Sequence, residues 1–251
     1  MQNNQQNNQY NNIDDFYAPP DLFAAAAAAD ERASFITKTY LYLFGSIMAL
    51  VAIDILLFAL AGGAKGMIEI LGPFFKGQFS WIIVLGAFML VSWDANSWAL
   101  NATSSAMQHA GLGLYVVAEA IILVPLLCLA LLTTGDASII VSAAMATGGL
   151  FAMLTVVVFV TRKDFSFLRT ILMFGGLAAL GLIATAVLFQ FALGPIFIYA
   201  MIALACGYIL YDTSNVLHHY RIGQHVAAAL ALFASVALLF WYILQLFLSR
   251  E

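Results

Sequence analysis

Long apolar runs dominate the chain, and seven of them are near the length of roughly 20 residues that a helix needs to cross a bilayer. Short polar or Gly/Pro-containing stretches separate them. The runs cover residues 40–61, 80–98, 112–132, 138–160, 171–193, 196–217 and 226–248. The pattern predicts an all-α, polytopic membrane protein with seven transmembrane helices.

The fifth and sixth runs are separated only by Gly194 and Pro195. Proline cannot continue the preceding helix, because its ring clashes with the previous turn and it lacks a backbone N–H. The dipeptide therefore predicts a tight hairpin of two spans.

Composition agrees with this interpretation. The chain is 64% hydrophobic and 9% charged, with a mean hydropathy of +0.97, far outside the range of soluble domains. Its few charges lie mostly outside the runs, which excludes a nucleic-acid binding surface and makes the lipid bilayer the expected partner. Cys128 and Cys206 both lie inside apolar runs, so neither a disulfide framework nor a metal site is predicted, and no cofactor is expected.

The N-terminal region differs in character. Ten of the first twelve residues are Gln or Asn, which predicts a disordered tail without the features of a signal peptide. The alanine run 24–29, ahead of Asp30, favours a helical lead-in to the membrane. We therefore divide the chain into a cytoplasmic tail and lead-in, 1–35, and a transmembrane domain, 36–251.

The basic residues predict the orientation, because Lys and Arg are retained on the cytoplasmic side. With the N-terminus inside, six of the nine basic residues lie in the cytoplasm and three outside. The six are Arg32, Lys38, Arg162, Lys163, Arg169 and Arg221, and the three are Lys65, Lys76 and Arg250. The distribution favours an N-in, C-out topology.

Asp212 is the only formally charged residue in the sixth run. An ionised Asp in the bilayer centre costs roughly 2.5 to 3.5 kcal/mol on insertion scales. Helical spacing places it in a stripe that must face protein or water. The stripe comprises Ala205, Tyr208, Asp212, Asn215 and His219. Asp212 is thus either a hydrogen-bonded acid that holds helices together or a proton or cation site.

Three further acids accompany Asp212. Glu119 lies in the middle of the third run, between Tyr115 and Pro125, where a broken helix would line a polar interior. Asp54, in the first run, is close enough to the end of the span to be satisfied by a neighbouring helix. Asp94 lies beside tryptophans and is expected at the membrane interface.

A histidine cluster follows the sixth run, at His218, His219 and His225. Histidine titrates near neutral pH, but the spacing is not that of a zinc site. The cluster is either a solvated cytoplasmic loop or, through His218 and His219, a means of tuning Asp212. The sequence contains no nucleophile elbow, phosphate-binding loop or metalloprotease motif, so we expect no enzymatic activity.

Two separated motifs resemble one family. Residues 161–168 read Thr-Arg-Lys-Asp-Phe-Ser-Phe-Leu, and residues 209–218 read Ile-Leu-Tyr-Asp-Thr-Ser-Asn-Val-Leu-His. With a looser match in the last run, residues 40–251 resemble the Bax inhibitor-1 family, and within it the bacterial YccA type. The resemblance implies six helices around the last one. It also implies a path for Ca²⁺ or H⁺ that is closed by acids of the last two helices.

The chain departs from that pattern at one position. Aligning residues 226–240 with the family's last span puts Ser235 where many members have an Asp that pairs with the counterpart of Asp212. Because serine does not titrate, a two-carboxylate pH latch is not expected here. Tyr242 and Gln245, on the same helix face, are alternative partners for Asp212. The YccA type also has a hydroxyl at this position, and that resemblance implies restraint of the membrane AAA protease FtsH in the inner (cytoplasmic) membrane.

Two functions therefore remain open. The first is modulation of an FtsH-like protease, and the alternative is a pH-sensitive Ca²⁺ or proton leak channel in which Ca²⁺ is only a permeant ion. The residues predicted to form the ion site or polar core are Asp212, Glu119, Asn215, Tyr208 and Ser235.

Overall fold

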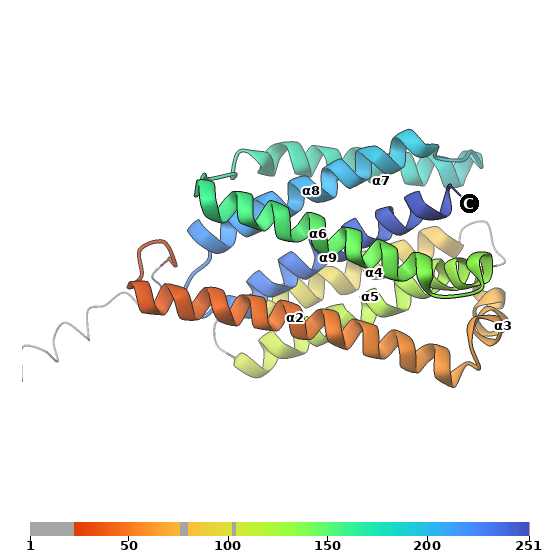
Figure 1. Ribbon diagram of the computed structural model, residues 1–251, viewed down its shortest axis with the longest axis horizontal. Helices are drawn as coiled ribbons and strands as arrows, with labels where there is room; N and C mark the ends of the chain where they lie inside the picture. Colours follow the sequence, from red (N-terminus) through yellow and green to blue (C-terminus); the bar gives the residue numbers. More distant parts are fainter. Residues whose placement is uncertain (1–22, 76–79, 102–103, 251) are drawn as a thin grey trace, which may run out of the picture.

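The structure, a computed structural model, describes residues 23–75, 80–101 and 104–250 (Figure 1). Within these ranges the chain forms helices and no strand longer than a single bridge. The helices are α2 (Ala29–Leu60), α3 (Ala64–Phe75), α4 (Ser80–Ala99), α5 (Ser105–Thr134), α6 (Ser138–Thr161), α7 (Leu168–Phe189), α8 (Pro195–His218) and α9 (His225–Leu248). All except α3 are long and apolar enough to cross a membrane, which confirms the prediction of seven spans.

The last helix, α9, lies in the centre of the bundle (Figure 1). It packs against α2, α4, α5, α6 and α8, and it is the most deeply buried of the spans. This position agrees with the expected central last helix. The helix α7 is peripheral, because it packs mainly against α8 and meets α4 only lightly.

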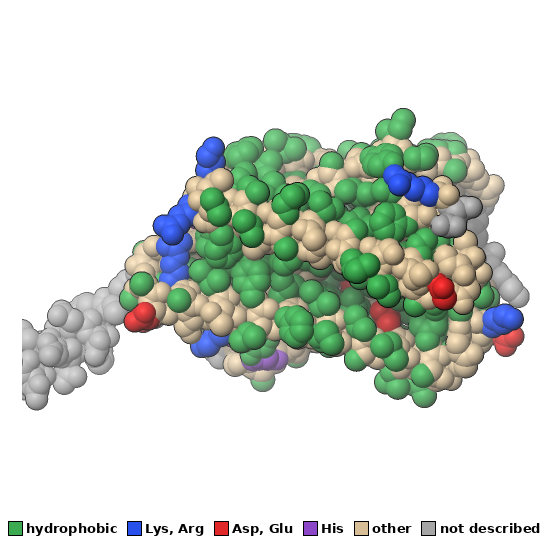
Figure 2. All heavy atoms as spheres, in the orientation of Figure 1, with side chains coloured by type: hydrophobic (Ala, Val, Ile, Leu, Met, Phe, Trp, Pro, Cys, Tyr) green, Lys and Arg blue, Asp and Glu red, His purple; other side chains and the backbone are tan. Residues whose placement is uncertain are grey.

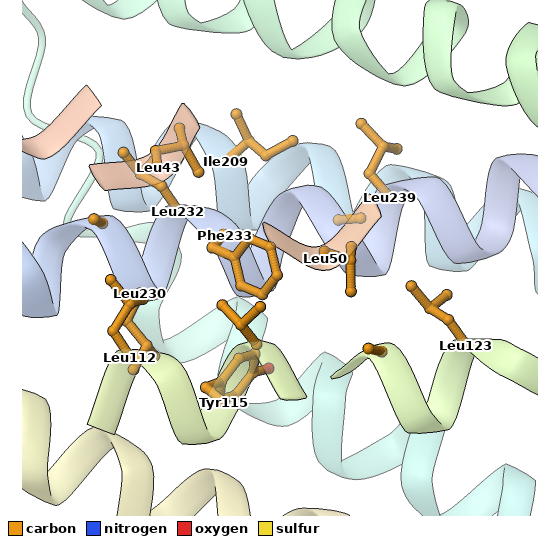
Figure 3. Packing of buried hydrophobic residues seen from close by; sticks show 14 of the residues in the cluster. Leu43, Leu50, Leu112, Tyr115, Leu123, Ile209, Leu230, Leu232, Phe233 and Leu239 are labelled. Atoms are coloured by element: carbon orange, nitrogen blue, oxygen red, sulfur yellow. The ribbon is translucent and has the colours of Figure 1, made fainter. Parts of the chain in front are cut away.

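The core lies between α9 and the helices around it (Figure 3). Phe233 and Leu232 of α9 are fully buried, and the ring of Tyr115 on α5 meets that of Phe233 edge-on at 6.0 Å between centroids. Leu43 of α2 and Ile209 of α8 belong to the same cluster. Because these large side chains come from four helices, the core holds α9 in one register.

The start of the described chain differs from its prediction. The alanine run 24–28 is not helical, and α2 begins only at Ala29. The backbone N–H of Ala24 donates to the carbonyl of Tyr220, and Phe23 forms a bridge with Arg221. These bonds to the α8–α9 connection replace the helical bonds that alanine favours. The predicted tail at residues 1–22 lies outside the described residues.

Three smaller differences concern helix ends. The structure contains the short helix α3 between the first two spans, which the search for long apolar runs did not predict. Pro125 does not break α5, which runs without interruption from Ser105 to Thr134. The hairpin at Pro195 is confirmed, but α7 ends at Phe189 and its connection to α8 is longer than expected. Gln190 ends α7 in a left-handed conformation, with φ of 57°.

Charged side chains lie mostly at the two ends of the bundle, with an apolar band between them (Figure 2). Lys and Arg gather at the end where α2 begins, which also carries the α6–α7 and α8–α9 connections. We call this the basic end. The sequence places Arg162, Lys163 and Arg221 in those two connections. Which side of the membrane the basic end faces remains a prediction.

Candidate functional site

Asp212 and Ser235 face each other across the α8–α9 hairpin. Both side chains are buried, and the Ser235 hydroxyl donates a hydrogen bond to Oδ2 of Asp212. They meet because α8 and α9 are consecutive antiparallel helices that pack along their length. The position that the alignment assigns to Ser235 is thus opposite Asp212 in space.

Ser235 and Glu119 open into the same cavity, although they lie on different helices. The cavity has a volume of about 1130 Å³ and is bounded by α4, α5, α7, α8 and α9. Its polar lining near the centre includes Glu119, Tyr115, Tyr208 and Ser235. It extends along α9 to Ser249, at the end opposite the basic end. Asp212 adjoins the cavity through its bond to Ser235.

Glu119 lies at mid-depth, 14 residues from the first residue of α5, which corresponds to about 21 Å along the helix. It is 6% exposed, and Asp54 of α2, at 9% exposed, is close enough for the two carboxylate charges to interact. The Oδ1 atom of Asp54 is buried without a hydrogen bond to any described residue. Two neighbouring acids without a basic partner favour a shared proton or a transient cation.

Asp54 is the member of this site that sequence reasoning undervalued. We expected a neighbouring helix to satisfy its carboxylate, but the neighbour supplies another acid, Glu119. The usable signal was the presence of a second acid in an apolar run. Across the part of the chain that the structure describes, no three His, Cys, Asp or Glu residues are grouped as metal ligands. The acid pair therefore suits passage of an ion better than tight binding.

Tyr208 and Asn215, two other predicted site residues, have different positions. The Tyr208 hydroxyl donates to the carbonyl of Leu172 at 2.9 Å and so ties α8 to α7, while its side chain also lines the cavity. Asn215 does not line the cavity. Its backbone carbonyl accepts hydrogen bonds from the N–H groups of His219 and Tyr220, which end α8. Tyr242 and Gln245, considered as partners for Asp212, line the cavity farther along α9.

The two sequence motifs contact each other at the basic end. The Phe165 N–H donates to the Ser214 hydroxyl at 2.9 Å, and the Asp164 carboxylate lies 3.3 Å from Nε2 of His219. His218 Nδ1 lies 3.0 Å from the carbonyl of Ser214. The structure thus places His219 against Asp164, where it holds the α6–α7 connection to α8.

The environment of Asp164 is reflected in its pKa. Slight burial raises the pKa of this carboxyl, but hydrogen bonds from the backbone and side chain of Ser166 and the charges of His219 and His218 outweigh it. The pKa consequently lies below the usual aspartate value. Asp164 is therefore ionised, and able to pair with a protonated His219, throughout the physiological range.

Comparison with known proteins identifies the family. The family model described as Inhibitor of apoptosis-promoting Bax1 matches residues 32–251. Protein LIFEGUARD 4 of Arabidopsis thaliana is 37% identical over 120 residues, which cover 45% of this chain and 48% of that protein. Bax inhibitor 1 of Schizosaccharomyces pombe is 35% identical over 120 residues, covering 46% of this chain and 44% of that protein.

The chain thus spans less than half the length of these two curated relatives in each match. No solved structure matches it. The family model nevertheless covers nearly all of α2 and every later span, including both contacting motifs and the buried acids. The chain therefore belongs to the Bax inhibitor-1 family of multi-pass membrane proteins.

Proposed function

We propose that this protein lets cations, either protons or Ca²⁺, leak across the membrane along a path that uses Glu119 and Asp212. The observation that carries the proposal is the shared cavity, which Glu119 lines directly and which Ser235 connects to Asp212. Acids facing a cavity inside a membrane commonly mark an ion or proton pathway. The cavity supplies the wide part of such a path.

The narrow part lies between Asp212 and the basic end. Asp212 is six residues from His218, the last residue of α8, or about 9 Å along the helix. Thr213, Ser214 and Val216 are fully buried there. This packed layer would close the path, and a change in charge at Asp212 would weaken its hold on Ser235 and α9.

Ion flux into liposomes tests this function. We expect Glu119→Gln to lower the flux of Ca²⁺ or H⁺ by roughly tenfold, which corresponds to about 1.4 kcal/mol. We expect Asp212→Asn to abolish its pH dependence. Asp94→Asn is the matched control, because Asp94 is exposed and does not line the cavity. If Asp212→Asn kept the native pH profile, or Glu119→Gln the native flux, the proposed path would be wrong.

A second candidate is modulation of a membrane AAA protease of the FtsH type in the inner membrane, with the N-terminus in the cytoplasm. The observation that favours it is the Ser235–Asp212 bond, because a hydroxyl in place of a second acid matches the YccA type. The Gln/Asn-rich tail would be the segment that the protease grips. The membrane domain would resist extraction because its backbone bonds are satisfied within the bilayer.

Deleting residues 1–20 tests the second candidate without touching a span. We expect slower turnover of the truncated protein and faster degradation of another substrate of the same protease. Pulse-chase labelling measures both rates, and membrane insertion of the truncated protein is the control. Unchanged rates would remove the tail from the mechanism.

A further inference from the structure

The cavity opens sideways, towards the bilayer, between α4 and α7. These two helices barely touch, and apolar side chains at the opening both line the cavity and are exposed at the protein surface. Met89 of α4 is 50% exposed, and Leu177 and Leu180 of α7 are 60% and 37% exposed. In a bilayer this opening faces hydrocarbon.

Small residues on the inner face of α7 create the space. Gly176, Ala179 and Ala186 line the cavity, and the two alanines are buried. Protein interiors are close-packed, and ligand pockets usually measure roughly 300–1,000 Å³. A cavity of about 1130 Å³ therefore has the size of a ligand site, well beyond a packing defect.

The lining specifies the chemistry of the occupant. It is mostly leucine, isoleucine, phenylalanine and alanine, which suits a hydrocarbon chain. Polar residues occur at two depths. Glu119 and Ser235 lie near the centre, and Gln245 and Ser249 lie at the end of α9, at the level expected for lipid head groups.

We propose that an acyl chain of a membrane phospholipid enters between α4 and α7 and occupies this cavity, with its head group beside Gln245 and Ser249. The inner part of the chain lies against Glu119 and Ser235 and excludes water from them. Given the proposed function, bound lipid closes the ion path, and its departure opens it. The binding site itself rests on the cavity alone.

Photolabelling tests the site. The full-length protein is reconstituted in liposomes that contain a phosphatidylglycerol with a diazirine in one acyl chain, and labelled residues are mapped by peptide mass spectrometry. We expect label on Ile122 and Leu126 of α5, because both line the cavity and are buried from the surrounding lipid. Label confined to outward residues would overturn the proposal, as would a polypeptide found cross-linked to the cavity in place of lipid.

Ala179→Phe and, as a second filling variant, Ala186→Phe should each reduce label on Ile122 and Leu126 at least fivefold. Ala178→Phe is the matched control, because Ala178 is the exposed neighbour and does not line the cavity. Each variant must elute as a single species in gel filtration. Native labelling in a correctly folded filling variant would contradict the site.

Flux measured on the same samples separates the two proposals. Cavity label without any ion flux supports the lipid site and rejects the leak. Flux without cavity label rejects the lipid site and retains the leak.

Discussion

At the scale of single residues, one hydroxyl meets the need of a buried carboxylate. Sequence reasoning placed Ser235 opposite Asp212, because the alignment of the last span uses only residues within one helix. It did not predict that Asp164 would face His219, since loop residues 161–168 follow no periodic pattern that determines their direction. Nor did it predict that Asp54 would meet Glu119, because that contact depends on how α2 and α5 cross. Register along a helix was predictable, whereas contacts between distant helices were not.

Ser235→Ala removes the only hydrogen bond that the described residues give to the Asp212 carboxylate. We expect a loss of about 1 kcal/mol in stability, since hydrogen bonds between membrane helices average about 0.6 kcal/mol and bonds to charged groups are stronger. Ser235→Thr keeps the hydroxyl and is the control. Unfolding in mixed detergent micelles measures the difference, and equal stability of the native protein and the alanine variant would mean that the bond contributes nothing.

At the scale of helices, the apolar runs predicted every span because each is long enough to cross the bilayer. Short helix α3 was missed because its 12 residues fall below that length. The alanine run 24–28 was predicted wrongly because bonds to the α8–α9 connection outweigh its helical propensity. The distance between paired helices was also hidden, because it depends on which face of each helix carries its small residues.

The α4–α5 crossing depends on Gly111. A Cβ atom there would lie 2.5 Å from the carbonyl oxygen of Ala95 and 2.8 Å from the backbone nitrogen of Ala99. Because backbone atoms cannot move aside, Gly111→Ala should force the helices apart and cost about 1–3 kcal/mol. Gly113, two residues on, has nothing within 4 Å of such a Cβ, so Gly113→Ala should be neutral or stabilising by up to about 1 kcal/mol.

Thermal unfolding of the two glycine variants in the same detergent gives the comparison. A melting temperature for Gly111→Ala at or above that of Gly113→Ala would show that the helices tolerate separation.

The α6–α7 connection should respond to acid through Asp164. Because the pKa of this carboxyl is lowered in the folded protein, its contribution is present above the ordinary aspartate value of 3.8 and is lost as the pH falls through the lower, folded-state pKa. A spin label at Phe167→Cys, an exposed position, should be equally immobile at about pH 5 and pH 7 and become mobile below about pH 4. Asp164→Asn should be mobile throughout, and a label indifferent to both changes would place Asp164 outside the contact.

At the scale of the whole molecule, the distribution of charge predicts a direction in the membrane. Basic side chains gather where α2 begins, and the opposite end carries few (Figure 2). A bundle with one strongly basic end is normally oriented with that end in the cytoplasm. Both motif-bearing segments would then be accessible to cytoplasmic partners, and the cavity would open nearer the outer face.

Cysteine labelling in intact cells measures that orientation. In a Cys128→Ala, Cys206→Ala background, Ser166→Cys should stay unlabelled by an impermeant maleimide, whereas Asp136→Cys should react. Both positions are exposed and lie at opposite ends of the bundle. After the cells are permeabilised, Ser166→Cys should react as well. The reverse pattern would invert the topology.

The central position of α9 has a consequence for biosynthesis. The six other spans leave the ribosome before the helix around which they pack, so they must wait in the membrane with their inner faces, including Asp54, Glu119 and Asp212, unpaired by the core helix. Premature termination before His225 would leave those acids permanently without the packing that α9 supplies. Membrane quality-control machinery recognises such exposed polar groups, so synthesis of the final helix is the step that separates a nascent chain marked for destruction from a mature one.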